Sequence, residues 1–249
     1  MVLSGLSGDH GAVCIYRISC YFGLVSIESK AKKKRGNAMK VLLINGSPHK
    51  EGCTFTALSE VAFTLNEEGI DTDYYWIGNK PIGGCIGCYQ CADRKECVFS
   101  DKVNEFTTMA ADYDGFVFGS PVYFSGMNGN LMSFMDRVFF SASAKDPHPF
   151  RFKPAAAICS ARRSGTTSTL DQMNKYFLHQ QMPIVSSRYW NMVHGNTPEE
   201  VKQDEEGMQV MRYLGRNMAW MLKLIENGKK NHVPFPKQER ERIATNFIR

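Results

Sequence analysis

Residues 40–56 read KVLLINGSPHKEGCTFT, and the rest of the chain is organised around this stretch. An apolar run, Val41–Ile44, meets a turn rich in Gly, Ser and Pro, and a helical pattern begins at about Thr54. A strand, a turn and a helix start in succession present backbone N–H groups and the positive end of a helix dipole to a phosphate. We interpret the stretch as a phosphate-binding turn, with an ordinary loop between a strand and a helix as the alternative.

The turn matches neither of the two commoner phosphate motifs. It lacks the GxxxxGK[ST] spacing of nucleoside-triphosphate sites and the GxGxxG spacing of dinucleotide folds. Its hydroxyls do suit a phosphate, since Ser47, Thr54 and Thr56 can each donate a hydrogen bond from one small cup. Local features therefore support the two interpretations about equally, and the rest of the chain has to decide.

Apolar periodicity continues the alternation of strands and helices along the chain. Five strands that alternate with five helices predict an α/β fold, a doubly wound parallel sheet in three layers. A stripe of Met and Leu along the last helix predicts core packing, with a subunit interface as the second reading. The expected strands are 41–44, 72–77, 115–119, 154–159 and 184–190, and the expected helices are 54–66, 103–111, 131–140, 168–181 and 198–227.

Ligands of such folds bind beyond the carboxyl ends of the strands, where the strand order reverses. The loops after the first, third and fourth strands lie on that edge, and the later two are SPVYFSGMNGN, residues 120–130, and SARRSGTT, residues 160–167. The second loop offers Tyr123 and Phe124 as flat apolar walls. A planar ring that carries a phosphate fits a place where these three loops converge.

Charge divides the chain into a basic beginning and a nearly neutral body. The 249 residues carry a net charge of +5, of which residues 1–38 contribute +4 and the remainder about +1. Nothing in the net charge of the body argues for nucleic acid as a partner. Length and composition are those of a globular protein with one full core.

The first 38 residues differ in character from the rest of the chain. Ala12–Ile27 is apolar, but Arg17 interrupts it, and it is too short for a membrane span and lacks the preceding basic region of a secretory signal. We expect residues 1–38 to be a disordered or spuriously translated extension, with a short signal-anchor as the alternative. Residues 39–230 then form the working domain and residues 231–249 a charged tail, in a cytoplasmic protein without a membrane partner.

Four of the eight cysteines fall within thirteen residues, at Cys85, Cys88, Cys91 and Cys97. In a chain without an export signal this clustering indicates metal or redox chemistry before structural disulfides. The spacing allows four thiolates to surround one small object such as an iron-sulfur cluster. Zinc is less favoured, because structural zinc sites use two cysteine pairs separated by a longer loop. Metal-free cysteines are the third reading.

Four segments of the chain together resemble one known family. The sequence is similar to the flavodoxin-like NAD(P)H-dependent FMN reductases, and within them to the iron-sulfur flavoproteins, over about residues 39–190. The segments are GSPHKEGCT at 46–54, CIGCYQCADRKEC at 85–97, GSPVYFSGMNGNLMSFMDR at 119–137 and SARRSGTT at 160–167.

The resemblance implies a flavodoxin-like fold and FMN as the cofactor. The chain departs from the family turn at two positions, since His49 stands where the family has Arg and Cys53 where it has Asn. Losing that permanent charge predicts weaker FMN binding, or binding that depends on protonation of His49. By resemblance, Ser47, His49, Cys53, Thr54 and Thr56 line the phosphate site, Pro121, Val122, Tyr123, Phe124 and Gly126 lie along the isoalloxazine, and Ala161, Arg162 and Gly165 close its other side.

The resemblance also implies that Cys85, Cys88, Cys91 and Cys97 hold a 4Fe-4S cluster. The expected function is an FMN-dependent oxidoreductase that takes electrons from NAD(P)H or a ferredoxin-like protein and passes them to a quinone, a flavin or another acceptor. No side-chain acid or nucleophile is expected to be essential, because the cofactor carries the chemistry. The alternatives are an electron-transfer or regulatory module without its own turnover, and a zinc-stabilised binding module. The family implies a homodimer or homotetramer.

Overall fold

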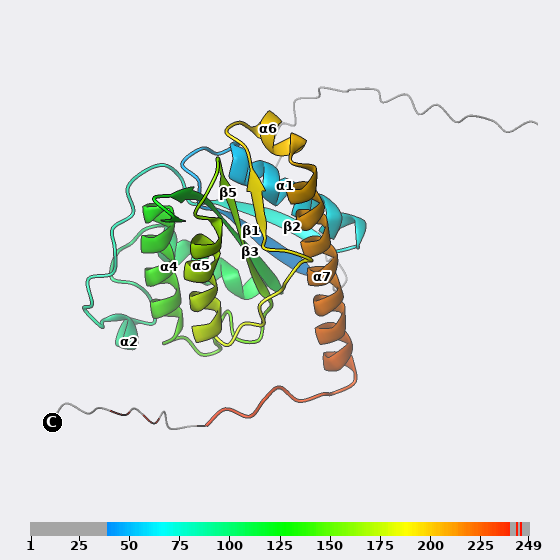
Figure 1. The fold of residues 1–249 in the computed structure, drawn as a ribbon. Helices are drawn as coiled ribbons and strands as arrows, with labels where there is room; N and C mark the ends of the chain where they lie inside the picture. Colours follow the sequence, from blue (N-terminus) through cyan, green and yellow to red (C-terminus); the bar gives the residue numbers. More distant parts are fainter. Residues whose placement is uncertain (1–38, 240–242, 244, 246–249) are drawn as a thin grey trace, which may run out of the picture. The chain divides into compact units, whose positions relative to one another are not determined.

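The computed structural model describes residues 39–239, 243 and 245, so the expectation about residues 1–38 lies outside the described residues. A twisted sheet with the strand order β2-β1-β3-β5-β6 forms the centre, and helices cover both of its faces (Figure 1). All pairs along this order are parallel, whereas β4 pairs antiparallel with β3. The doubly wound α/β prediction is confirmed, with β4 as an addition to the five expected strands. The strands are β1 Lys40–Asn45, β2 Asp71–Trp76, β3 Gly115–Tyr123, β4 Gly126–Met127, β5 Ala155–Ala161 and β6 Met192–His194.

The helices divide between the two faces of the sheet (Figure 1). One face carries α3, α4 and α5, and the other carries α1, α6 and α7. Among the described residues, no helix is both long and apolar enough to cross a membrane. The helices are α1 Cys53–Glu67, α2 Cys91–Arg94, α3 Lys102–Met109, the 3-10 turn η1 Ala110–Asp112, α4 Gly129–Ala142, α5 Thr166–His179, α6 Pro198–Gln203 and α7 Glu205–Lys230.

The first strand is apolar throughout because it contributes to two cores. Leu42 and Ile44 pack against the core beneath α3, α4 and α5. Val41 and Leu43 point to the opposite face, against α1 and α7. Successive side chains of a strand alternate between faces, so a strand covered on both sides reads as an uninterrupted apolar run. This double burial places the phosphate-binding turn at the end of a fixed central strand.

The fifth parallel strand was predicted at residues 184–190, and this prediction is wrong. Ile184 forms only an isolated bridge with Ala155, and the continuous strand β6 begins at Met192. Between them the chain leaves the sheet, and Tyr189 and Trp190 are about half exposed and pack edge to face on each other. The apolar pattern that indicated one strand therefore has two parts, the start at Ile184 and Val185, which packs against the core, and this surface pair.

The single long helix predicted from residue 198 is two helices. Asp204 separates α6 from α7, since its carboxylate caps α7 by accepting from the N–H of Gly207 at 2.9 Å. The same carboxylate accepts from the N–H of His194 at 2.6 Å and so ties β6 to the break. A side chain that accepts backbone N–H groups favours a helix start over a helix interior. After Lys230 the chain forms neither helix nor strand through residue 239.

The inner stripe of α7 packs against α1, as the core interpretation predicted. Met211, Leu214 and Met218 are fully buried there. Gly215 allows the close approach, because a Cβ at this position would lie 2.8 Å from the Cβ of Thr64. The contact fixes α1, and with it the helix start that comes after the first turn.

Candidate functional site

Three loops meet at the carboxyl edge of the sheet, where the chain passes from β1 to β2 on one side and to β3 on the other. Such a reversal of strand order opens the crevice in which open α/β sheets bind ligands. The first loop is joined to β3 by the N–H of Gly46, which donates to the carbonyl of Gly119 at 2.8 Å. The side chain of Thr54 joins α1 to β5, since its hydroxyl lies 2.8 Å from that of Ser160.

The first turn is shaped by the buried side chain of Asn45. Its oxygen accepts from the N–H of Ser47 at 2.9 Å, and its amide donates to the carbonyl of Lys50 at 2.9 Å. The indole of Trp76 donates to the Ser47 carbonyl at 2.8 Å from the neighbouring strand. These bonds satisfy polar groups of the turn from one side, so the backbone is held in a fixed curve around the start of α1.

The N-terminus of α1 carries no side-chain cap. Gly52 stands at the N-cap position and has no side chain that could accept from the first turn of the helix. The first N–H groups of a helix have no partner within the helix, so they remain available to an anion. Gly119 permits this helix start to approach β3, because a Cβ there would lie 2.8 Å from Cγ2 of Thr54. An uncapped helix start in a Gly-lined cradle fits a phosphate group.

The expected phosphate hydroxyls are not equivalent in the structure. The Ser47 oxygen accepts from the N–H of His49 at 3.1 Å, which leaves the Ser47 hydrogen free to donate. The Thr56 hydroxyl donates to the carbonyl of Gly52 at 3.2 Å, within its own helix. The Thr54 hydroxyl is paired with Ser160. Ser47 is therefore the hydroxyl best placed to donate outward, while the phosphate roles of all these residues stay predictions.

Cys53 is the first residue of α1 and lies beside the loop after β6. Its Sγ is 3.8 Å from the carbonyl oxygen of Gly195. Burial raises the pKa of the Cys53 thiol, and the nearby carboxylates of Glu200 and Glu199 raise this pKa further. The thiol consequently stays neutral at physiological pH and adds no negative charge to the helix start.

The second loop is a tight hairpin between β3 and β4. Tyr123 pairs with Gly126, and the two residues between them, Phe124 and Ser125, have φ values of 49° and 59°. Positive φ at both central positions is the pattern of a type I′ turn, which side chains other than Gly, Asn and Asp adopt at a cost. Phe124 is fully exposed and Tyr123 is 42% exposed, so both rings stand at the surface of the site.

The third loop holds this hairpin in place. Gly165 has a φ of +91°, and a Cβ on it would lie 2.6 Å from the Cα of Ser125. Ser168 of α5 donates to the Ser125 carbonyl at 2.5 Å, and Gln172 accepts from the N–H of Met127 at 3.0 Å. The second and third loops are therefore in direct contact, as the prediction of one convergent site required.

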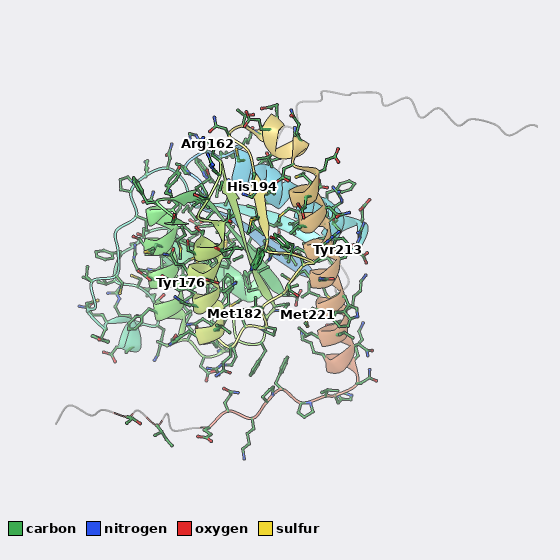
Figure 2. The ribbon with its side chains drawn as sticks, in the orientation of Figure 1. Arg162, Tyr176, Met182, His194, Tyr213 and Met221 are labelled. Atoms are coloured by element: carbon green, nitrogen blue, oxygen red, sulfur yellow. The ribbon has the colours of Figure 1, made fainter. Side chains whose placement is uncertain are left out.

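The remaining predicted residues of the second and third loops lie on the same edge. Pro121 and Val122 are half-buried in the last part of β3, and Ala161 is buried at the end of β5. Arg162 is exposed and directly follows Ala161, which pairs with His194 of β6 (Figure 2). The structure thus brings all three groups of predicted FMN-binding residues to one end of the sheet.

The four clustered cysteines line a second pocket, beside α4. Cys85, Cys88, Cys91 and Cys97 all contribute to its wall. Burial raises the pKa of the Cys91 thiol, and the neighbouring thiols Cys88, Cys97 and Cys85 raise this pKa further. Most of the other lining residues are apolar, and Arg137 and Ser141 of α4 complete the wall. The apolar residues are Ile86, Tyr89, Val98, Phe99 and Phe140.

Four thiols that share one pocket fit an iron-sulfur cluster in donor type and number. The described part of the chain contains no group of three or more His, Cys, Asp or Glu side chains placed to hold a metal ion. The fit therefore rests on the donor set and on the apolar lining that surrounds it.

Three side chains from other elements hold residues 85–97, the cysteine segment, in place. Asn130 donates to the carbonyl of Lys80 at 3.1 Å, before the segment begins. Asn104 of α3 accepts from the N–H of Cys97 and donates to its carbonyl, both at 2.8 Å. Arg137 of α4 reaches the sulfur of Cys97 at 3.3 Å. The pocket is therefore assembled by tertiary contacts rather than by the segment itself.

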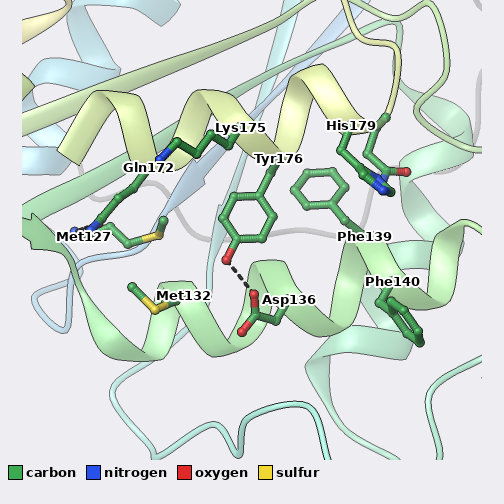
Figure 3. A pocket seen from close by; sticks show the side chains of 10 residues that line it. Met127, Met132, Asp136, Phe139, Phe140, Gln172, Lys175, Tyr176 and His179 are labelled. Atoms are coloured by element: carbon green, nitrogen blue, oxygen red, sulfur yellow. Dashed lines mark hydrogen bonds between the residues drawn. The ribbon is translucent and has the colours of Figure 1, made fainter. Parts of the chain in front are cut away.

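A cavity of about 450 Å³ lies between α4 and α5, adjacent to both sites. Tyr176 of α5 points toward α4 and donates to Asp136 at 2.5 Å, with Met132 and Phe139 on either side (Figure 3). Burial raises the pKa of the Tyr176 phenol, and its bond to Asp136 raises this pKa further. The cavity shares Phe140 with the cysteine pocket. Its size and mainly apolar lining are those of small-molecule sites.

Sequence reasoning missed Asn45, Ser160 and Asn104 as residues that shape the sites. Asn45 had a readable signal, because it is a polar residue at the end of an apolar strand and directly precedes a Gly-Ser-Pro turn. Ser160 and Asn104 had none, since each acts through a partner far away in the sequence, Thr54 and Cys97 respectively.

The chain matches the family described as NADPH-dependent FMN reductase over residues 39–197. It is 33% identical over 195 residues to an iron-sulfur flavoprotein of Methanocaldococcus jannaschii, a match that covers 76% of this chain and all of the relative. An iron-sulfur flavoprotein of Archaeoglobus fulgidus is 30% identical over 194 residues, which cover 74% of this chain and 97% of that protein.

Solved structures with the same fold are more distant in sequence. The NAD(P)H:quinone oxidoreductase of Methanothermobacter marburgensis superposes with a TM-score of 0.57 at 17% identity, covering 73% of this chain and 100% of that chain. A flavodoxin from the domain Archaea gives a TM-score of 0.50 at 14% identity, covering 74% of this chain and 99% of that chain. At these identities the likeness shows the flavodoxin-like fold alone.

Proposed function

The chain belongs to the family of NADPH-dependent FMN reductases, within its iron-sulfur flavoprotein branch, and on that premise we propose how its sites work as an FMN-dependent oxidoreductase. One observation carries the proposal. Three loops that are separate in sequence converge around an uncapped helix start at the carboxyl edge of the sheet. A phosphate and a planar ring are the two parts of FMN that such an edge accommodates.

We assign the phosphate of FMN to the first turn. The free N–H groups at the start of α1 and the outward hydrogen of Ser47 would donate to its oxygens. His49 lies in the same turn, and a protonated imidazole there would add a positive charge near the phosphate. Asn45 holds the turn in the shape that aims these donors.

The isoalloxazine ring would lie against the hairpin of the second loop. The exposed rings of Tyr123 and Phe124 would supply apolar walls, and the third loop from Ala161 to Gly165 would close the opposite side. FMN supplies the redox chemistry when it is bound. The protein's own groups bind the phosphate, orient the ring and exclude water from one of its faces, so no side-chain acid or nucleophile is required.

The proposed donor is NAD(P)H or a ferredoxin-like protein, and the proposed acceptor is a quinone, a flavin or a similar small molecule. Cys85, Cys88, Cys91 and Cys97 are the residues that would hold a 4Fe-4S cluster. Such a cluster would supply single-electron transfer beside the two-electron chemistry of the flavin. We further propose a homodimer or homotetramer, on the strength of the family alone.

The alternative is an FMN-binding electron-transfer or regulatory module without turnover of its own. Steady-state oxidation of NADH and NADPH separates the two. An oxidoreductase turns over with at least one of them and a quinone acceptor, whereas an electron carrier does so only when a separate reductase is supplied.

The visible absorption spectrum of the full chain, purified without oxygen, tests the cofactor assignment directly. Flavin bands overlaid by a broad absorption that bleaches with dithionite are expected. Flavin bands without the broad absorption would leave the FMN reductase and remove the cluster. A colourless protein would contradict both assignments and favour the zinc-stabilised module.

A further inference from the structure

Arg137 is a buried guanidinium at the edge of the cysteine pocket, with 2% of its side chain exposed. A buried charge is tolerated only when its donors are satisfied. The guanidinium of Arg137 donates four hydrogen bonds. Nε donates to Sγ of Cys97 at 3.3 Å, and Nη1 donates to the carbonyl of Gly83 at 3.2 Å. Nη1 and Nη2 also donate to the two carboxylate oxygens of Asp101, at 2.7 and 2.9 Å. The ring of Phe99 lies 4.8 Å from its Cζ.

These contacts join the two ends of the cysteine segment. Gly83 precedes the first cysteine, and Asp101 comes after the last one. Between them the segment contains only the short helix α2, and none of the residues of α2 is buried. None of residues 85–97 is buried, and their packing is limited to contacts such as those of Cys97 with the core and of Tyr89 with Phe140. The guanidinium of Arg137 and the side chain of Asn104 therefore hold the segment through hydrogen bonds from other elements.

The bond to sulfur is not needed to neutralise the charge. Asp101 already pairs with the guanidinium in the bidentate geometry that satisfies an arginine best. Nε is nevertheless aimed at Cys97, the cysteine that stands apart from the compact CxxCxxC run. In the described part of the chain, no charged side chain makes a comparable hydrogen bond to Cys85, Cys88 or Cys91.

We propose that Arg137 is a positioning residue, which holds the sulfur of Cys97 in the pocket and makes the group bound by the four cysteines easier to reduce. The proposal rests on the cluster of the proposed function. Reduction adds one electron, from the flavin or a ferredoxin-like donor, and increases the negative charge on the ligating sulfurs without forming or breaking a bond. An N–H group that donates to one of those sulfurs stabilises the reduced form more than the oxidised form.

Two substitutions of Arg137 and one matched control test this role in the full chain. Arg137→Lys keeps a positive charge but lacks the planar fork that reaches sulfur and carboxylate together, and Arg137→Gln also removes the charge. The control is Arg94→Lys, because Arg94 lies in the same segment but is exposed and pairs with the exposed Glu96 at 3.1 Å.

The measurement is the midpoint potential of the cluster in chains that retain iron, titrated without oxygen and monitored by electron paramagnetic resonance. The potential is expected to become more negative in Arg137→Lys, to fall further in Arg137→Gln and to stay unchanged in Arg94→Lys. A merely structural role would lower iron content and thermal stability but leave the potential of the loaded chains as it is. Equal potentials in all four proteins would overturn the proposal.

Asp101→Asn gives a second test that does not remove the arginine. The amide can still accept from the N–H of Val103 at the start of α3, so the helix cap is retained. Without the carboxylate charge, the guanidinium acts on the sulfur uncompensated, and the potential is expected to shift in the positive direction. A negative shift, or none, would count against the assigned role.

The proposed function and this inference fail in different ways. If the wild-type chain holds no iron, the cluster assignment is wrong. The positioning role of Arg137 can still be measured by hydrogen exchange. Arg137→Lys is then expected to speed amide exchange in residues 97–101, whereas Arg94→Lys leaves it unchanged. Unaltered exchange in Arg137→Lys would refute the positioning role by itself.

Discussion

Asn45 shows how much of a binding site one side chain can determine. It bonds to backbone groups on both sides of the first turn, so Asn45→Ala removes the internal support of that turn. Unsatisfied backbone groups cost about 1–3 kcal/mol, and we expect FMN to bind at least about tenfold more weakly. Quenching of flavin fluorescence measures this affinity. Asn66→Ala at the exposed end of α1 is the control, and equal affinities of the two variants would refute the role of Asn45.

The lowered pKa of Lys153 predicts that the stability of the protein depends on pH. Burial lowers its pKa to about 8 from 10.5, with Lys229 adding to the effect and Asp114 opposing it. Between about pH 8 and 10.5 the unfolded chain therefore binds more protons than the folded chain, so the free energy of unfolding gains a contribution that rises with pH. Below about pH 8 both states are protonated and the folded state carries the full penalty.

Comparison with Lys153→Met isolates this contribution from the other titrating groups. From about pH 7.5 to pH 10, the stability of the wild type relative to the variant should rise by about 1 kcal/mol, after allowing for solvent screening. Urea unfolding at the two pH values measures the difference. A constant difference would show that Lys153 keeps its ordinary pKa.

At the scale of elements, the approach of α1 to β3 depends on Gly119. A methyl group there would lie within 2.8 Å of Thr54 and 3.0 Å of Leu58, so Gly119→Ala must displace the start of α1. We expect a loss of about 1–3 kcal/mol of stability together with weaker FMN binding. Gly129→Ala is the control, because its Cβ would meet no atom within 4 Å. Denaturant unfolding and flavin titration measure both variants. Equal changes in Gly119→Ala and Gly129→Ala would contradict the role of Gly119.

The hairpin between β3 and β4 keeps Phe124 and Ser125 in a conformation that suits Asn and Gly better. The double variant Phe124→Asn with Ser125→Gly should relieve this strain and raise the free energy of unfolding by about 1 kcal/mol. It should also weaken FMN binding, because the ring of Phe124 is the proposed wall. Phe63→Asn, which removes an exposed ring from α1, controls for the loss of surface area. Undiminished FMN affinity in the double variant would remove Phe124 from the site.

At the scale of the whole molecule, the flavin and cysteine sites stand on different loops and should be separable. Cys88→Ala is expected to abolish iron binding while FMN affinity stays within about twofold, because no bond of the first turn or the hairpin involves the cysteine segment. Cys159→Ala, which alters a buried cysteine in β5, should keep its iron. The iron and flavin contents of the purified chains show whether the two sites are separable. Full iron content in Cys88→Ala would contradict the cluster assignment.

Much of the fold is readable from local patterns. The double burial of the central strands appears as uninterrupted apolar runs, and Gly, Ser and Pro mark the loops at their ends. The fifth parallel strand and the last helix were placed wrongly because tertiary contacts outweigh the pattern there. The rings of Tyr189 and Trp190 pack on each other at the surface. The carboxylate of Asp204 accepts from the N–H of His194 and interrupts the helix at a point where the apolar periodicity continues.

Short-range spacing and composition were enough to predict the fold class and the family, and they also indicated the residue types of both candidate sites. Which of those residues lie together depends on tertiary contacts. The pairing of Thr54 with Ser160 and of Arg137 with Cys97 joins residues that are far apart along the chain. Local periodicity carries no information about such pairs, because they form only when the packed sheet and helices bring distant loops to the same place.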